Sequence, residues 1–275
     1  MKKSLLTLVA GAVLLAVSCS KKSHTASLEK AAAAQEVSIR VMSYNVHHCN
    51  PPDKPGVIDI DGIAAVINEQ SPDLVALQEI DVNTGRSGSL NQAEELGKKT
   101  GMKYFFGKAI DYDGGAYGVA ILSKYDIAAP TVHKLPTLAG TNGEPRVLAT
   151  VKVSLPGGAT IRFASTHLDA QRADTNRDLQ IKEINRLVSA DSLPFVIAGD
   201  FNAIPGSSII EQLDSKFTRS CQNCDPTIPI VNPNKTIDFI AFRPAEKIRA
   251  KSTKVLTGIQ ASDHLPVVAE LTLTP

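Results

Sequence analysis

Acidic, amide and imidazole side chains follow short apolar runs at several places along this chain of 275 residues. They include Glu79 after Ala76-Leu77-Gln78, Asp200 after an apolar run, and Asp263-His264 near the C-terminus. The other candidates of this kind are Asn45, His167, Asn202 and Asp238. Carboxylate and amide oxygens bind hard divalent cations, and imidazoles and carboxylates move protons or stabilise developing charge. Together they offer cation ligands, a general base and groups that stabilise developing charge, which are the requirements of metal-assisted hydrolysis.

These side chains can act together only if secondary structure brings the ends of several strands to one place. Strands are predicted by β-rich alternating or apolar runs, and helices by apolar residues at a spacing of three or four. The expected strands cover residues 37–46, 74–80, 104–106, 117–122, 146–155, 160–168, 195–199, 235–242, 251–256 and 265–273. The expected helices cover residues 59–69, 92–100, 176–189 and 207–213. This order permits two packed sheets with helices outside them.

The motifs, in their order along the chain, resemble the active site of the endonuclease/exonuclease/phosphatase superfamily. They are Leu77-Gln78-Glu79, Thr166-His167-Leu168-Asp169, Gly199-Asp200-Phe201-Asn202, Ile237-Asp238-Phe239-Ile240 and Ser262-Asp263-His264. The resemblance covers residues 37–275 and implies one domain. It also implies an α/β fold, a four-layered α/β sandwich in which two central mixed β-sheets are flanked by helices. Members of this superfamily resemble deoxyribonucleases, bacterial sphingomyelinases and inositol-polyphosphate phosphatases.

The resemblance also implies which residues bind the metal. Glu79 and Asp263 correspond to metal-side carboxylates, and Asn45 corresponds to an amide beside the metal. Mg²⁺ is the expected ion because it prefers oxygen ligands, and Mn²⁺ is the alternative.

The remaining site residues correspond to groups that handle water and phosphate. Asp200 would activate the attacking water, and Asn202 would orient the water or the phosphate. His264 would contact the scissile phosphate, with Asp238 orienting it and favouring its charged form. His167 would stabilise the phosphoryl group or protonate the leaving oxygen.

Other positions near these motifs are open to more than one interpretation. Arg86 and Arg146 are candidate substrate-binding residues, and for each a plain structural or solvated charge is an equal alternative. Val119 stands where an asparagine is common in the family, which leaves substrate choice open. His47 stands where some nucleases of the superfamily carry a metal-ligand aspartate, which argues against the apurinic-endonuclease branch. His48 is expected to be structural or exposed.

The N-terminus resembles an export signal. Lys2 and Lys3 precede an apolar run at 5–17, which is too short for a comfortable membrane span, so residues 1–18 are predicted to be a signal peptide. Small residues before Cys19 resemble a lipobox, although leucine is commoner where Ala16 stands. We therefore expect a lipoprotein anchored through a lipidated Cys19, with residues 19–36 as a flexible tether. The expected location is the periplasmic side of a membrane, and plain secretion is the alternative.

Composition narrows the substrate classes. The chain is 43% hydrophobic and carries a formal net charge of +1, which becomes −1 when Lys2 and Lys3 are removed. A basic footprint, the usual mark of proteins that hold long nucleic acid, is therefore lacking. Nucleic acid remains possible as a substrate only. Cys221 and Cys224 are expected to form a structural disulfide or an idle thiol pair.

These observations lead to one leading hypothesis and three alternatives. The leading one is a Mg²⁺-dependent phosphohydrolase that acts, as a monomer, on a small or lipid-borne phosphodiester. The alternatives are an exported nuclease, a phosphomonoesterase acting on inositol or sugar phosphates, and a non-catalytic binding protein.

Overall fold

Two mixed β-sheets of six strands each form the centre of the molecule in the computed structural model, which describes Met1 and residues 36–274. The first sheet has the order β11 (Ile248–Val255), β12 (Val267–Leu273), β1 (Val37–Asn45), β2 (Leu74–Val82), β4 (Gly115–Ser123) and β3 (Lys103–Tyr112). The second has the order β5 (Ile127–Lys134), β6 (Val147–Ser154), β7 (Thr160–His167), β8 (Phe195–Asp200), β10 (Asp238–Arg243) and β9 (Thr218–Arg219).

The two sheets share one pairing pattern. Each contains a single parallel pair, β1 with β2 and β7 with β8, and all its other neighbours are antiparallel. A helix lies between the parallel strands in each case, α1 (Ile60–Gln70) in the first sheet and α3 (Thr175–Ser189) in the second. Such a connection is the usual way to join parallel neighbours, and it places the carboxyl ends of both strands at one edge.

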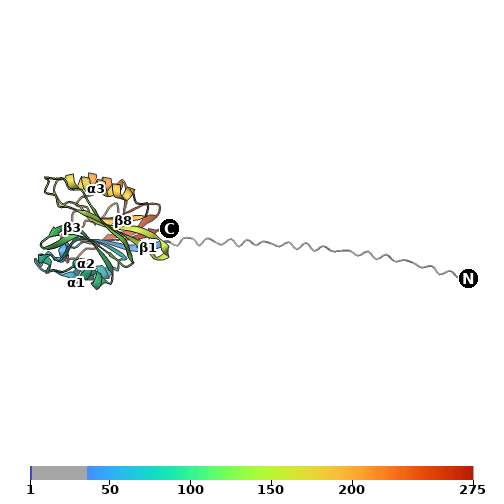
Figure 1. The fold of residues 1–275 in the computed structure, drawn as a ribbon, viewed down its shortest axis with the longest axis horizontal. Helices are drawn as coiled ribbons and strands as arrows, with labels where there is room; N and C mark the ends of the chain where they lie inside the picture. Colours follow the sequence, from blue (N-terminus) through green and yellow to red (C-terminus); the bar gives the residue numbers. More distant parts are fainter. Residues whose placement is uncertain (2–35, 275) are drawn as a thin grey trace. The chain divides into compact units, whose positions relative to one another are not determined.

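Alternation along the strands explains the layers. In β1, Ile39 and Val41 belong to the core between the sheets, whereas Met42 and Tyr44 belong to the core beneath the helices. Successive side chains of a strand point to opposite faces, so a strand apolar on both faces must be covered on both. Helices α1 and α2 (Gln92–Thr100) lie on one side of the strands and α3 on the other (Figure 1). The short α4 (Ser208–Asp214) packs with α3 on the outer face of the second sheet.

Local sequence fixes where the helices begin and end. The side chains of Asp59, Asn91 and Ser207 cap α1, α2 and α4 by accepting hydrogen bonds from backbone N–H groups of the first turn. Gly101 closes α2 with φ of 66°, a left-handed conformation that costs glycine little. Three short 3₁₀ turns, His47–Cys49, Gly85–Ser87 and Pro156–Gly158, complete the secondary structure of the described residues.

The observed architecture confirms the predicted α/β sandwich, with two mixed sheets flanked by four helices among the described residues. Two strands escaped prediction. β5 is an edge strand that contains Pro130 and a register shift between Ala128 and Thr131, so its alternation is broken. β9 has only two residues. The strand expected at 104–106 is longer and runs from Lys103 to Tyr112.

The continuous part of the described region begins at Glu36, the last residue of the predicted tether. The predicted signal peptide and tether lie outside it, apart from their end residues Met1 and Glu36. No helix in the described part of the chain is long and apolar enough to cross a membrane.

Cys221 and Cys224 form a disulfide, and Cys49 is a buried free thiol.

Candidate active site

The first half of the site lies on the parallel pair β1 and β2. Asn45 is the last residue of β1, and Glu79 lies in β2 where the register with β4 shifts between Leu77 and Ile80. Glu79 has φ of 58°, an unusual conformation for a residue with a side chain. This irregularity in the strand re-aims the side chain, as bulges near active sites commonly do. The Asn45 amide Nδ2 donates to Glu79 Oε1 at 3.0 Å.

The second half lies on the parallel pair β7 and β8. His167 ends β7 and Asp200 ends β8, and the two residues are direct partners in the parallel register. Asp200 Oδ2 lies 3.6 Å from His167 Nε2. The same oxygen accepts a hydrogen bond from Asn45 Nδ2 at 3.2 Å, so Asn45 connects the carboxylates of the two sheets.

The third contribution comes from β10 and the loop before β12. Asp238 opposes Asp200 across the antiparallel pair, and its Oδ2 lies 2.9 Å from His264 Nδ1. His264 Nε2 lies 3.8 Å from Asp200 Oδ2. Ser262 Oγ donates to the backbone oxygen of Asn45 at 2.7 Å, which fixes this loop to the end of β1.

The two histidines have opposite electrostatic environments. Burial, with the nearby charges of Arg146 and His264, lowers the pKa of His167 well below its usual value. Burial acts in the same direction on His264, but the adjacent Asp238 carboxylate outweighs it and raises the pKa of His264 to about 10. His167 is therefore neutral and His264 is positively charged near neutral pH.

The central carboxylate is also perturbed. Burial, followed by repulsion from Asp238, raises the pKa of Asp200 to about 7. Burial likewise raises the pKa of Glu79, a tendency that Asn45 opposes through its hydrogen bond. Strongly shifted carboxylates that lie beside histidines are typical of functional sites.

Asn202 and Asp263 complete the set of predicted core residues. Asn202 has φ of 48°, and its backbone N–H donates to Asp200 Oδ1 at 2.8 Å. Its amide Nδ2 donates to the backbone oxygen of Leu168 at 3.0 Å, so this amide connects the ends of β7 and β8. Asp263 is partly exposed and close enough to Glu79 to raise the pKa of that carboxyl.

The structure places the two predicted substrate arginines in different surroundings. Arg86 makes a bidentate pair with the buried Asp81, through Nε at 2.7 Å and Nη2 at 2.9 Å. Its guanidinium also lies over the Tyr112 ring, 4.5 Å from the centroid, and lines a cavity beside Glu79. Its predicted contact with substrate remains a prediction.

Arg146 is only 6% exposed and donates from Nη1 to His167 Nδ1 at 3.2 Å. Since Nδ1 of His167 accepts this bond, its proton lies on Nε2, the nitrogen that faces Asp200. In this arrangement Arg146 positions His167, and its substrate role remains a prediction.

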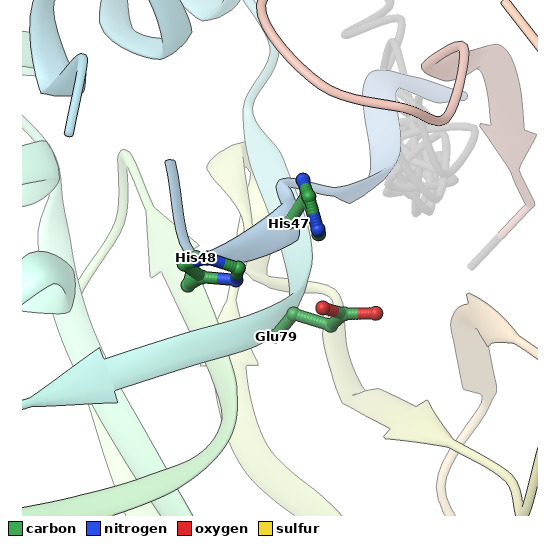
Figure 2. Close-up of side chains that lie close together, drawn as sticks. All are labelled: His47, His48 and Glu79. Carbon is green, nitrogen blue, oxygen red and sulfur yellow. The ribbon is translucent and has the colours of Figure 1, made fainter. Parts of the chain in front are cut away.

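His47 and His48 are neighbours of the site that the sequence did not single out as functional. One ring nitrogen of each histidine and one carboxylate oxygen of Glu79 lie within 4.8 Å of one another (Figure 2). Burial, with the charges of Arg86 and His47, lowers the pKa of His48 to about 4. The sequence signal available was the pair of imidazoles placed two and three residues after Asn45.

Comparison with known proteins identifies the family. The profile of the "Endonuclease/Exonuclease/phosphatase family" matches residues 42–264, a span that contains every core site residue described above. The chain belongs to the endonuclease/exonuclease/phosphatase family. Enzymes of this family are phosphoesterases and nucleases that typically depend on a divalent metal, so hydrolase activity is supported at the level of the family.

Proteins similar to this chain match it over most of its length. The chain is 24% identical over 254 residues to the uncharacterized protein YbhP of Shigella flexneri, covering 87% of this chain and 98% of that protein. The structure of an endonuclease/exonuclease/phosphatase from Beutenbergia cavernae is similar at a TM-score of 0.74, with 25% identity, over 86% of this chain and 72% of that one. A mannosyl-6-phosphatase of Bacteroides thetaiotaomicron shares the fold at a TM-score of 0.69, with 21% identity, over 85% and 99% of the chains.

The donor set of this family member fits a divalent cation. Glu79 offers a carboxylate oxygen, with ring nitrogens of His47 and His48 beside it. Asp263 is near enough to raise the pKa of Glu79, and its role as a second metal-side carboxylate remains a prediction. The Asn45 oxygen accepts the backbone N–H of His47 at 3.1 Å, and its nitrogen donates to both Glu79 and Asp200. With the amide in this orientation, Asn45 positions the carboxylates, and its predicted role as a ligand remains a prediction.

Proposed function

We propose that this protein is a metal-dependent phosphohydrolase that cleaves a small or lipid-borne phosphodiester by attack of an activated water. One observation supports this most directly: the Asp200 carboxylate lies between a neutral His167 and a charged His264, and Asn45 connects it to Glu79. A general base, a neutral hydrogen-bond donor, a positive charge and a cation-binding carboxylate are thereby gathered at one place.

Each residue then has a definite task. Asp200 accepts the proton of the attacking water, and a pKa of about 7 suits a base that works near neutral pH. His264, held charged by Asp238, stabilises the negative charge that develops on the phosphoryl oxygens. His167 carries its proton on Nε2, because Arg146 occupies Nδ1, and donates a hydrogen bond from Nε2 that stabilises the charge on the phosphoryl or leaving oxygen. A divalent cation bound through Glu79 and Asp263 would supply further polarisation of the phosphoryl group.

Three features support the choice of a small or lipid-borne substrate. The chain lacks net positive charge after loss of its N-terminal lysines, which disfavours tight binding of long nucleic acid. The cavity beside Glu79 measures about 200 Å³, smaller than the pockets that enclose drug-sized ligands. The lipobox-like sequence before Cys19 implies a membrane-anchored protein on the periplasmic side, near lipid headgroups.

A second candidate function is hydrolysis of a sugar or inositol phosphomonoester. The observation in its favour is the similarity in fold to a mannosyl-6-phosphatase. The same core residues would serve this reaction, because they act on the phosphoryl group itself. Monoesters and diesters differ only in the number of ester groups that the phosphate carries. An exported nuclease remains the third candidate.

A matched substrate panel tests these proposals. The purified protein with Mg²⁺ is given duplex DNA, single-stranded DNA, sphingomyelin, a phosphoinositide and a sugar phosphate. We expect turnover of a lipid or small ester that is lost in His264→Ala and retained in His133→Ala, since His133 lies on β5 and contacts Thr150 instead of the site. Turnover of DNA alone would refute the substrate class. Undiminished turnover in His264→Ala would refute the catalytic assignment and favour a binding role for this site.

The anchoring proposal has its own test. We expect the mature protein in the membrane fraction, with acyl chains on Cys19 detected by mass spectrometry. Recovery of an unacylated protein from the soluble fraction would show plain secretion instead.

A further inference from the structure

The turn after β1 has an unusual backbone. His47, His48 and Cys49 have φ values of 47°, 42° and 59°, so three consecutive residues with side chains adopt left-handed conformations. Residues other than glycine rarely do so even singly, and such strain persists only where the surroundings enforce it. Here Gln92 Nε2 donates to the His48 oxygen at 2.7 Å, and the Asn50 N–H donates to the His47 oxygen at 2.8 Å.

The consequence of this turn is that two adjacent imidazoles lie together. In an extended chain, successive side chains point to opposite faces. The rings of His47 and His48 instead pack edge to face with centroids 4.5 Å apart. Glu79, itself at a φ of 58°, reaches the same place from β2, and the three ligand atoms lie within 4.8 Å of one another (Figure 2).

The ring nitrogens have the partners that a metal site requires. His47 Nδ1 lies 2.9 Å from the backbone oxygen of Asn50, to which it can donate, and this fixes the ring and leaves Nε2 with its lone pair. Metal-binding histidines commonly donate their other nitrogen to a carbonyl in this way. His48 Nδ1 is buried, and no hydrogen-bond partner is found for it among the described residues. A buried polar atom without a partner indicates an absent ligand or a missing interaction.

We propose that His47, His48 and Glu79 form a metal site for a divalent transition-metal ion of borderline hardness, such as Zn²⁺. Two imidazoles and one carboxylate make a donor set that suits Zn²⁺ and leaves a position open, whereas Mg²⁺ prefers oxygen ligands alone. The cavity lined by these three residues and Arg86 provides room at that open position. The inference builds on the proposed function, because Glu79 belongs both to this set and to the set of Asn45, Glu79 and Asp263. It assigns this protein a metal chemistry based on nitrogen ligands, which the second set alone does not provide.

The test measures metal binding directly. Untagged full-length protein is titrated with Zn²⁺ and with Mg²⁺ by calorimetry, and with Co²⁺ by visible absorption, which responds to nitrogen ligands. The variants are His47→Asn and His48→Asn, because asparagine tolerates the left-handed conformation. His133→Asn, on β5, is the matched control. Circular dichroism and thermal unfolding verify that each variant is folded. If His48→Asn does not fold, His48→Gly replaces it in the titrations.

We expect each of the two site variants to weaken Zn²⁺ binding by about tenfold or more and to change the Co²⁺ spectrum. Mg²⁺ binding should change by less than about threefold, because its preferred oxygen donors remain. The control should match the parent. Zn²⁺ outbinds Mg²⁺ at most sites of mixed donors, so the decisive comparison is between variants and not between metals.

Unchanged Zn²⁺ affinity and an unchanged Co²⁺ spectrum in both site variants would overturn the proposal. Such a result would place any bound ion elsewhere, for instance at Asp200, Asp238 and His264, which also gather their ligand atoms within 4.8 Å. Binding that depends on His47 and His48, without hydrolysis of any ester, would refute the proposed function and leave this inference intact. Hydrolysis with Mg²⁺ and no histidine-dependent Zn²⁺ binding would do the reverse.

Discussion

A single added methyl group at Gly199 should separate the strands that carry the site. A Cβ at this position would lie 2.1 Å from the backbone oxygen of Thr166 on the neighbouring β7. Real Cβ contacts essentially never fall below 3.0 Å, so Gly199→Ala must widen the gap by about 0.9 Å. The obstacle is backbone, so rotation of a side chain cannot relieve it. We expect a loss of about 1–3 kcal/mol in the free energy of unfolding, as overpacked cores show.

The same substitution should also slow catalysis. Asp200 follows Gly199 directly and is paired with His167 across the same strands, so the shift acts on the distance between base and histidine. A misplacement of about 1 Å at a reacting centre costs about 10²-fold in rate, and we expect kcat to fall by about that factor.

The assay compares steady-state hydrolysis with urea unfolding of the same preparations. Gly101→Ala is the control, because Gly101 has φ of 66° and no atom within 4 Å of an added Cβ. It should cost about 1–2 kcal/mol of stability through backbone strain while leaving kcat unchanged. If folded Gly199→Ala retained the parent's kcat within threefold, close registration of β7 and β8 would not set the geometry of this site.

Three further predictions concern the surroundings of the site. Asp81→Asn, which weakens the buried partner of Arg86, should lower the free energy of unfolding by about 2–3 kcal/mol in urea titrations. Arg146→Gln should lower kcat about 10- to 100-fold with KM nearly unchanged, because Arg146 holds the ring of His167. Chelation of divalent ions with EDTA should abolish hydrolysis, and an excess of Mg²⁺ should restore it.

Each of these has a contrary outcome. Equal stability of Asp81→Asn and the parent would mean that the Arg86 pair contributes nothing. A raised KM with normal kcat in Arg146→Gln would show that this arginine binds substrate instead of positioning His167. Full activity after exhaustive chelation would remove the metal from the mechanism.

Most helices and strands could be predicted from the local sequence, because the apolar side chains that each one buries recur at the spacing of a helix or a strand. The helix expected at 92–100 forms with these bounds: Gly101 ends it, and the structure shows that Asn91 caps its start. β5 shows where such reasoning fails: its residues are largely exposed, Pro130 interrupts the pattern, and only the pairing with β6 makes it a strand. That pairing is a tertiary property, which no local window contains.

The candidate site also contains residues that local sequence predicts and residues that only the tertiary structure brings together. Strand-end motifs such as that containing Asp200 are local and could be recognised along the chain. The contact of Arg146 with His167 joins residues 21 positions apart, and the gathering of His47, His48 and Glu79 depends on left-handed backbone at two separate places. Single-residue propensities do not favour such conformations, so the sequence could not place these side chains.

The repeated pairing pattern of the two sheets makes the site modular. Each sheet contributes residues of its own parallel pair: Asn45 and the neighbouring Glu79 from the first, His167 and Asp200 from the second. Each pair also has its own helical cover, so the apolar packing beneath one pair can change without repacking the other. Under the proposed function and metal site, a change confined to the turn after β1 would alter the metal preference and leave the residues proposed for acid–base chemistry in place.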